Sequence, residues 1–289
     1  MPGDIKELKH LEELYLDNNF LEFLPNELTG LKNLRILSAS GNLITELNTS
    51  FCANARFKSN IERLNLSRNK LKNSTFTYKV ALFQKLMYFD LSENLFELVP
   101  NPLPKNIIEL NLNKNKIKSL MIIPMSSQER SDEEILAALG MRDKKITKEV
   151  SSSFGHGFDD VALKKSFILD DTIYDEPDID KKDELQLPHV FFLRQMKRLY
   201  LTDNLITEVP ADFGILNSRL EFIDMSRNLL TQLDLSLCRG LVGLKHLDLT
   251  ANQIASLPNK IRELSDLEYL NLSHNLLSKI LSSILFFWN

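Results

Sequence analysis

One nine-residue string, Leu-x-x-Leu-x-Leu-x-x-Asn, recurs along the chain and constrains its fold more than any other feature. Residues 11–19, 244–252 and 267–275 match it in full, and six further copies replace one or two of the leucines by other apolar residues. The copies close at Asn19, Asn42, Asn69, Asn94, Asn115, Asn204, Asn228, Asn252 and Asn275. These asparagines lie 23, 27, 25, 21, 89, 24, 24 and 23 residues apart, so the chain repeats one structural unit with a single long interruption.

The spacing within the string predicts a short strand in every unit. Alternate side chains of a strand point to opposite faces, so both leucines of Leu-x-Leu point inward and the residues beside them point outward. One unit cannot bury its leucines alone, and stacking of the units supplies the missing neighbours. For the last two units we expect buried Leu247, Leu249, Leu270 and Leu272, and exposed His246 and Tyr269.

The closing asparagine of each copy is predicted to turn its amide inward. There it can satisfy backbone groups of a tight turn, each of which would cost about 1–3 kcal/mol if buried without a partner. An asparagine that merely lies on the surface would not recur at nine matched positions.

A second pattern of apolar residues at intervals of three identifies the class of repeat. Its members are Pro25, Leu28, Leu31 and Leu34 in one unit, and Pro258, Ile261, Leu264 and Leu267 in another. With the nine-residue string, this pattern makes the chain resemble the leucine-rich repeat family, and within it the 23-residue, Leu-Pro-containing class of intracellular Ras-signalling scaffolds. The resemblance implies an α/β-type, right-handed horseshoe solenoid with a parallel concave sheet. Short helices, 3-10 turns or loops would cover its convex side.

The 89-residue interval divides the expected repeats into two blocks, residues 1–121 and 187–289, separated by an insertion at residues 122–186. Residues 124–189 hold 16 Asp and Glu against 9 Lys and Arg, a net charge of −7. We expect a flexible linker with one short helix near residues 132–139, because the capping box of residues 131–134 leads into an apolar stretch there. The alternative is a phosphorylatable or partner-binding arm, in which Thr172 and Tyr174 are the hydroxyls open to modification.

The sequence contains no motif typical of catalysis. It has no phosphate-binding glycine loop, no Gly-x-Ser-x-Gly elbow and no His-Glu-x-x-His zinc motif, and its five histidines lack metal-ligand spacing. We therefore expect a protein that is not an enzyme and that uses no cofactor and no metal ion.

The overall charge and the two cysteines bear on partners and location. A net charge of −4 gives little attraction to nucleic acid or to an anionic membrane, so we expect neither as a partner. Cys52 and Cys238 lack the spacing of a disulfide framework, and the sequence begins without a secretory signal pattern. These observations favour a cytoplasmic location.

The residues that point outward from the strands form columns across the concave face. One column places Phe222, His246 and Tyr269 in successive units, and exposed aromatic and arginine side chains often dominate binding energy. The candidate partner-binding residues are Tyr88, Arg198, Tyr200, Phe222, Asp224, Arg227, His246, Asp248 and Tyr269. Alternatively, the rings only cover their neighbours in the sheet.

These features predict a protein-protein interaction scaffold or adaptor that binds a protein on its concave face. A broad face with charges of both signs suits a folded partner better than a small-molecule substrate. A different possibility is the regulatory or substrate-recruiting segment of a larger enzyme, such as a phosphatase, kinase or ubiquitin ligase. Neither end resembles a polar cap, so we expect a piece of a longer protein, with an apolar cap or docking tail as the alternative.

Overall fold

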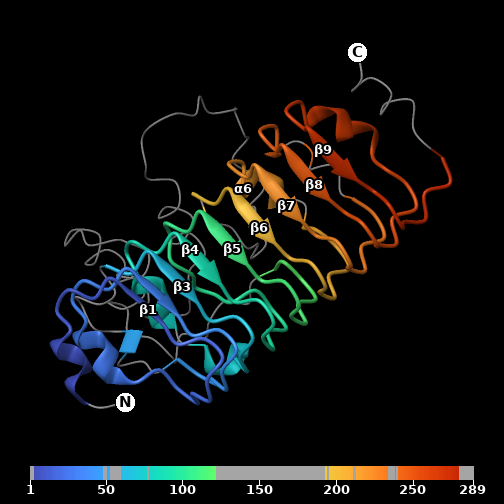
Figure 1. The fold of residues 1–289 in the computed structure, drawn as a ribbon. Coiled ribbons are helices and arrows are strands. Elements are labelled where there is room, and N and C mark those ends of the chain that lie inside the picture. The colour runs from blue at the N-terminus through green and yellow to red at the C-terminus, as the bar shows by residue number, and fades with distance from the viewer. Residues whose placement is uncertain are drawn as a thin grey trace, which may run out of the picture. The chain divides into compact units, whose positions relative to one another are not determined.

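The chain folds into stacked units whose strands lie side by side, as the repeated string predicts (Figure 1). The computed structural model describes residues 3–47, 51–52, 60–76, 78–121, 193, 195–210, 213–233, 238 and 240–279. The expected insertion, its helix near residues 132–139, and Thr172 and Tyr174 lie outside the described residues.

Nine three-residue strands form one parallel sheet in sequence order within the described part of the chain. They are β1 (Glu13–Tyr15), β2 (Ile36–Ser38), β3 (Arg63–Asn65), β4 (Tyr88–Asp90), β5 (Glu109–Asn111), β6 (Arg198–Tyr200), β7 (Phe222–Asp224), β8 (His246–Asp248) and β9 (Tyr269–Asn271). Each begins at the third residue of the nine-residue string. The prediction of a right-handed solenoid with a parallel concave sheet is therefore confirmed.

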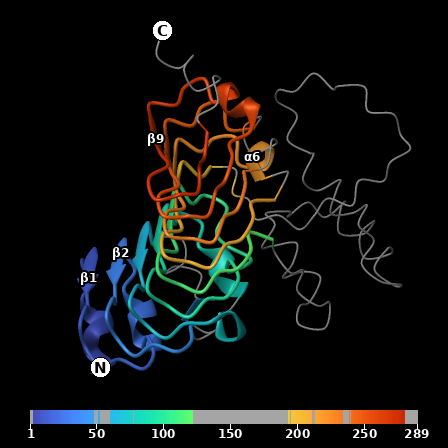
Figure 2. The same ribbon diagram turned by 90° about the vertical axis from the view of Figure 1, so that its right-hand side faces the viewer.

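Short helices connect the strands on the other side of the solenoid, where Figure 2 shows α6 facing away from β1, β2 and β9. The 3-10 helices are η1 (Gly3–Glu7), η2 (Asn26–Gly30), η3 (Asn73–Thr75), η4 (Tyr78–Leu82) and η7 (Asn259–Glu263), and α6 is Phe213–Leu216. Pro25 and Pro258, which begin the intervals of three in the sequence, directly precede η2 and η7. The proline at each of these positions fixes an extended entry into a tight 3-10 turn.

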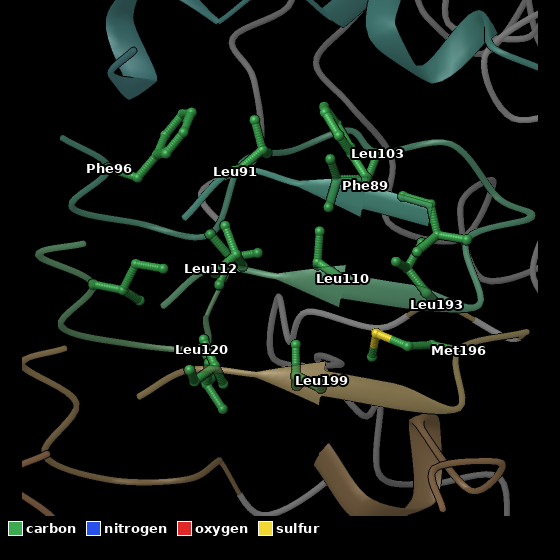
Figure 3. Packing of buried hydrophobic residues seen from close by; sticks show 14 of the residues in the cluster. Phe89, Leu91, Phe96, Leu103, Leu110, Leu112, Leu120, Leu193, Met196 and Leu199 are labelled. Carbon is green, nitrogen blue, oxygen red and sulfur yellow. The ribbon is translucent and has the colours of Figure 1, made fainter. Parts of the chain in front are cut away.

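The sheet continues directly from β5 to β6, although 86 residues separate Asn111 from Arg198. Glu109 pairs with Arg198 in register, and the Leu112 amide donates to the Tyr200 carbonyl at 2.9 Å. Figure 3 shows Leu110 between Phe89 and Leu199 in the apolar core. All three side chains are at most 2% exposed, so the two blocks share one core.

The expected burial of the leucines in the last two units holds only for the first of them. Leu247 and Leu249 are buried, whereas Leu270 and Leu272 are only partly buried, which corrects the prediction. The reason is their place in the sheet. Among the described residues, β9 pairs with a strand on one side only, so these residues do not supply the covering unit that stacking supplies elsewhere.

The closing asparagines form a hydrogen-bonded ladder along the solenoid. Asn228 is typical: its Nδ2 donates to the carbonyls of Leu201, Met225 and Ser226 at 2.9–3.1 Å, and its Oδ1 accepts from the Ile206 amide at 3.0 Å. The inward amide is confirmed for the buried asparagines from Asn42 to Asn252. Asn19 departs from the prediction: it is exposed, and its amide bonds only to carbonyls of its own unit.

The residue directly before each closing asparagine adopts a left-handed backbone, which the sequence pattern did not predict. These residues are Asn18, Gly41, Arg68, Glu93, Lys114, Asp203, Arg227, Ala251 and His274, with φ between 52° and 66°. The conformation costs a non-glycine residue about 1–2 kcal/mol. From the unit of Asn42 to that of Asn252, the asparagine ladder holds the turn in this strained form.

This strain leads to a testable expectation for Ala251, whose φ is 54°. Ala251→Gly removes the Cβ penalty but adds backbone entropy to the unfolded chain, and we expect a net gain of about 0.5 kcal/mol in unfolding free energy. Ala255, whose φ is not positive, provides the control, because Ala255→Gly is expected to destabilise by a similar amount. Urea denaturation followed by circular dichroism compares them, and a loss for both variants would contradict the strain at residue 251.

Candidate functional site

The outward side chains of the strands form two columns on the concave face. The register pairs Arg198 with Phe222, Phe222 with His246 and His246 with Tyr269, which places them in one column. Tyr200, Asp224 and Asp248 follow in the neighbouring column. All seven come from the four strands β6–β9, which succeed one another along the solenoid in Figure 1.

Four rings of this surface stack in a continuous row, the ring stack, formed by Tyr200, Phe222, His246 and Tyr269. The ring centroids of Phe222 and His246 lie 4.2 Å apart with an interplanar angle of 12°, and those of His246 and Tyr269 lie 4.1 Å apart at 2°. Tyr200 extends the row from the neighbouring column, 4.9 Å from Phe222 at 40°. Ring contacts at these separations contribute about 0.5–1.5 kcal/mol each beyond the area they bury.

The stack corrects one expectation and confirms another. His246 was expected to be exposed but is half-buried, because Phe222 covers one face of its ring and Tyr269 the other. Tyr269 is 42% exposed, as expected. The alternative interpretation, in which the rings only cover their neighbours in the sheet, therefore applies to His246. The ring of Tyr269, at the end of the stack, is accessible to solvent.

Tyr88 lies apart from the ring stack. Its ring is covered by the guanidinium group of Arg63, whose Cζ lies 3.7 Å from the ring centroid, a cation–π contact between β3 and β4. Glu109 and Arg198, which form an ion pair at 3.3 Å, separate it from Phe222 in the column. The contributions of Arg63 and Glu109 to this surface were missed in the sequence, although both occupy the same motif position as Phe222.

Asp224 and Asp248 each hold a turn. The Oδ1 of Asp224 accepts from the Ser226 amide at 2.9 Å, and the Oδ1 of Asp248 accepts from the Thr250 amide at 2.8 Å. The sequence analysis also missed this turn, although the sequence carries a signal for it. The same motif position holds Asn65, Asn111 and Asn271, which make the same bond. Asp and Asn side chains commonly bond the amide two residues on.

The rim of the surface carries paired charges. Arg227 is exposed and lies 3.5 Å from the Asp203 carboxylate, and Lys197 Nζ donates to Glu221 Oε1 at 2.7 Å. That bond lowers the pKa of Glu221 below its usual value. Burial raises the pKa of Tyr200, with a further contribution from the negative charge of Glu109. The hydroxyl of Tyr200 therefore stays protonated at neutral pH.

Two other kinds of feature are absent from the described ranges. No group of three or more His, Cys, Asp or Glu side chains there is arranged to hold a metal ion. In the same ranges, no helix has both the length and the apolar character needed to cross a bilayer. Cys52 and Cys238 are buried, and burial raises the pKa of Cys52 to about 12, so its thiol is a poor nucleophile.

Comparisons with known proteins agree with this architecture. A leucine rich repeat family model matches residues 194–254, and a second matches residues 10–31 and 266–288. Among solved structures, a plant peptide hormone receptor, RGFR1 in complex with RGF2, is similar over 99% of this chain and 36% of its own, with 21% identity and a TM-score of 0.58. The Toll–Spatzle complex of Drosophila matches 96% of this chain and 28% of its own, with 18% identity and a TM-score of 0.62.

Similar sequences come from several kinds of protein. Osteomodulin of Bos taurus is 24% identical over 92% of this chain, mouse keratocan is 26% identical over 77%, and adenylate cyclase of Schizosaccharomyces pombe is 40% identical over 37%. The chain spans 52%, 58% and 6% of these three relatives, respectively. It therefore covers less than two thirds of each.

The comparisons overturn the expected cytoplasmic location. Osteomodulin, keratocan and podocan are secreted extracellular matrix proteins. The expectation was wrong because it relied on the spacing of two cysteines, an amino-terminal pattern and a resemblance to an intracellular class. That class is not confirmed by the family models, which match leucine-rich repeats in general.

Proposed function

Because this chain is a leucine-rich repeat protein, we propose that it is a protein-binding module that holds a partner on the concave surface of β6–β9. The observation that carries the proposal is the ring stack of Tyr200, Phe222, His246 and Tyr269. Its rings cross four successive strands on one face, so a single partner can cover them together. Aromatic side chains in such central positions dominate the energy of many interfaces.

The neighbouring charges suit a protein partner. Glu109–Arg198 and Asp203–Arg227 place both signs of charge beside the rings, and this mixture is typical of the polar rim of protein interfaces. The similar structures support the same class of ligand, since one receptor is in complex with a peptide hormone and Toll is in complex with Spatzle. A protein or peptide is therefore the proposed partner.

Truncation of the rings tests the proposal. We expect Phe222→Ala and Tyr269→Ala to weaken the affinity for a captured partner about thirtyfold each, which corresponds to about 2 kcal/mol. Both variants are expected to fold, because neither residue is an inward leucine or a ladder asparagine. Pull-down of the partner followed by titration calorimetry gives the affinities, and circular dichroism gives the fold.

Lys260→Ala provides the matched control on the other side of the solenoid, in η7. Its affinity is expected to equal that of the unchanged protein. Equal affinities of Phe222→Ala, Tyr269→Ala and Lys260→Ala, with all three folded, would move the binding site away from the ring stack.

A second candidate function is supported by one comparison. The similarity to adenylate cyclase covers 6% of that enzyme, so repeats like these occur as a small segment of a much longer catalytic protein. In that case this chain would regulate a catalytic domain elsewhere in its own protein, or would recruit substrates to that domain. The genomic sequence on both sides distinguishes the two candidates, because only the second requires an adjoining catalytic domain.

A further inference from the structure

Two carboxylates lie side by side on the concave surface of β6–β9. Asp224 on β7 and Asp248 on β8 are direct partners in the parallel register, and both point to the outward face. Adjacent strands are about 4.8 Å apart, and like charges directly opposite each other destabilise a sheet. A cation between the two carboxylates would remove this repulsion.

The turns that these residues hold do not require a negative charge. Asn65, Asn111 and Asn271 make the same bond to the amide two residues on, with Oδ1 to nitrogen distances of 3.0–3.1 Å. A neutral amide thus satisfies the same turn in three other units. The two charges at Asp224 and Asp248 call for a separate explanation.

Nearby charges on this surface are neutralised within the chain, but those of Asp224 and Asp248 are not. Glu109 pairs with Arg198, Glu221 with Lys197, and Asp203 with Arg227. Within the ranges that the structure describes, no cation forms an ion pair with Asp224 or Asp248. In the same ranges, the one side chain that donates to either carboxylate is the neutral amide of Asn271, whose Nδ2 lies 3.5 Å from Asp248 Oδ2.

The ring stack adjoins the two carboxylates on the same strands. Phe222 and His246 stand two residues before Asp224 and Asp248, on the same outward face. A guanidinium group is planar, packs well against aromatic rings and presents five donors that can reach two carboxylates at once. An ammonium group is a smaller, more strongly hydrated point charge, so it gains less from the aromatic rings and from the pair of carboxylates.

We propose that the partner inserts an arginine side chain beside the ring stack, with its guanidinium group between the carboxylates of Asp224 and Asp248. This inference rests on the proposed function, because it specifies how the same surface recognises a protein. Oδ2 of each carboxylate accepts from the guanidinium, while Oδ1 keeps its bond to the turn amide. At Asp248 the guanidinium adds to the long 3.5 Å bond from Asn271. The outward edges of Phe222 and His246 pack against the aliphatic part of the side chain.

A peptide probe tests the inference without a known partner. The probe is an acetylated, amidated pentapeptide with one central arginine, compared with peptides that carry citrulline or lysine at that place. Citrulline keeps the shape of arginine and removes its charge. We expect the arginine peptide to bind at least about tenfold more tightly than the citrulline peptide, as judged from NMR chemical-shift titration, with lysine between them.

Neutral variants identify the site. Asp224→Asn and Asp248→Asn preserve the turn, and each is expected to weaken binding of the arginine peptide about tenfold, to the level of citrulline. The matched control is Asp90→Asn, since Asp90 holds the same turn but lies opposite Asn65 and Asn111. Its affinity for the arginine peptide is expected to be unchanged.

Several results would overturn the inference. The inference is wrong if the arginine and citrulline peptides bind with equal affinity, or if neither peptide shifts the NMR signals. It is also wrong if Asp224→Asn, Asp248→Asn and Asp90→Asn lose the same affinity for the arginine peptide. Failure of the proposed function looks different, because it would be seen as unchanged partner affinity in Phe222→Ala and Tyr269→Ala. If those ring variants lose the partner while Asp224→Asn and Asp248→Asn retain it, the proposed binding surface is supported and the proposed arginine contact is wrong.

Discussion

Asn228→Ala is expected to lower the free energy of unfolding by about 3 kcal/mol. The side chain is 4% exposed and satisfies three backbone carbonyls and one backbone amide in two adjacent units. Alanine leaves the buried Ile206 amide without its acceptor, which costs about 1–3 kcal/mol. Each of the three carbonyls loses one bond and keeps one other donor, which is Asn204 Nδ2 for Leu201, Asn252 Nδ2 for Met225 and the Asp203 amide for Ser226. Partial entry of water keeps the total below the sum. Urea denaturation followed by far-ultraviolet circular dichroism measures the loss.

The same motif position in the first unit provides the control. Asn19 is exposed and donates only to the carbonyls of Leu16 and Asp17 in its own unit. Because water can replace these bonds, Asn19→Ala is expected to cost less than about 1 kcal/mol. Equal losses in Asn19→Ala and Asn228→Ala would show that the bonds between units do not stabilise the solenoid.

Much of the fold was predictable because the repeated string specifies which side chains point inward. The spacing of Leu-x-Leu gave the strand positions, and the continuation of the sheet across the long interval follows from the match between the units ending at Asn115 and Asn204. The partial burial of Leu270 could have been anticipated only from its place at the end of the sheet. Periodicity describes an interior unit and not the ends of a stack.

The candidate site was predictable as a column but not as a set of contacts. Motif position placed Phe222, His246 and Tyr269 in one row, whereas the inclusion of Tyr200 from the next column depends on side-chain rotamers. The left-handed turn before each ladder asparagine was hidden for a related reason. Residues such as Arg227 and Lys114 do not favour positive φ, so the turn is imposed by hydrogen bonds between units rather than by the local sequence.

Leu110→Ala is expected to lower the free energy of unfolding by about 3 kcal/mol and to affect both blocks of repeats. Leu110 is fully buried in β5 and pairs in register with Phe89 on β4 and Leu199 on β6. Truncation of a buried leucine removes transfer free energy and leaves a cavity, which together cost about 2–5 kcal/mol. Leu270→Ala, at the same motif position in β9, is only partly buried and is expected to cost less than half as much.

The location of Leu110 at the junction of the blocks makes its effect informative about cooperativity. In a solenoid each unit is stabilised by its nearest neighbours, so weakening the contact between β5 and β6 removes support from both sides. We expect hydrogen exchange measured by mass spectrometry to become faster in Leu110→Ala for residues 60–121 and for residues 195–233. Faster exchange confined to residues 60–121 would mean that the later block is stable without its neighbour, and the shared core at Leu110 and Leu199 would then contribute little to it.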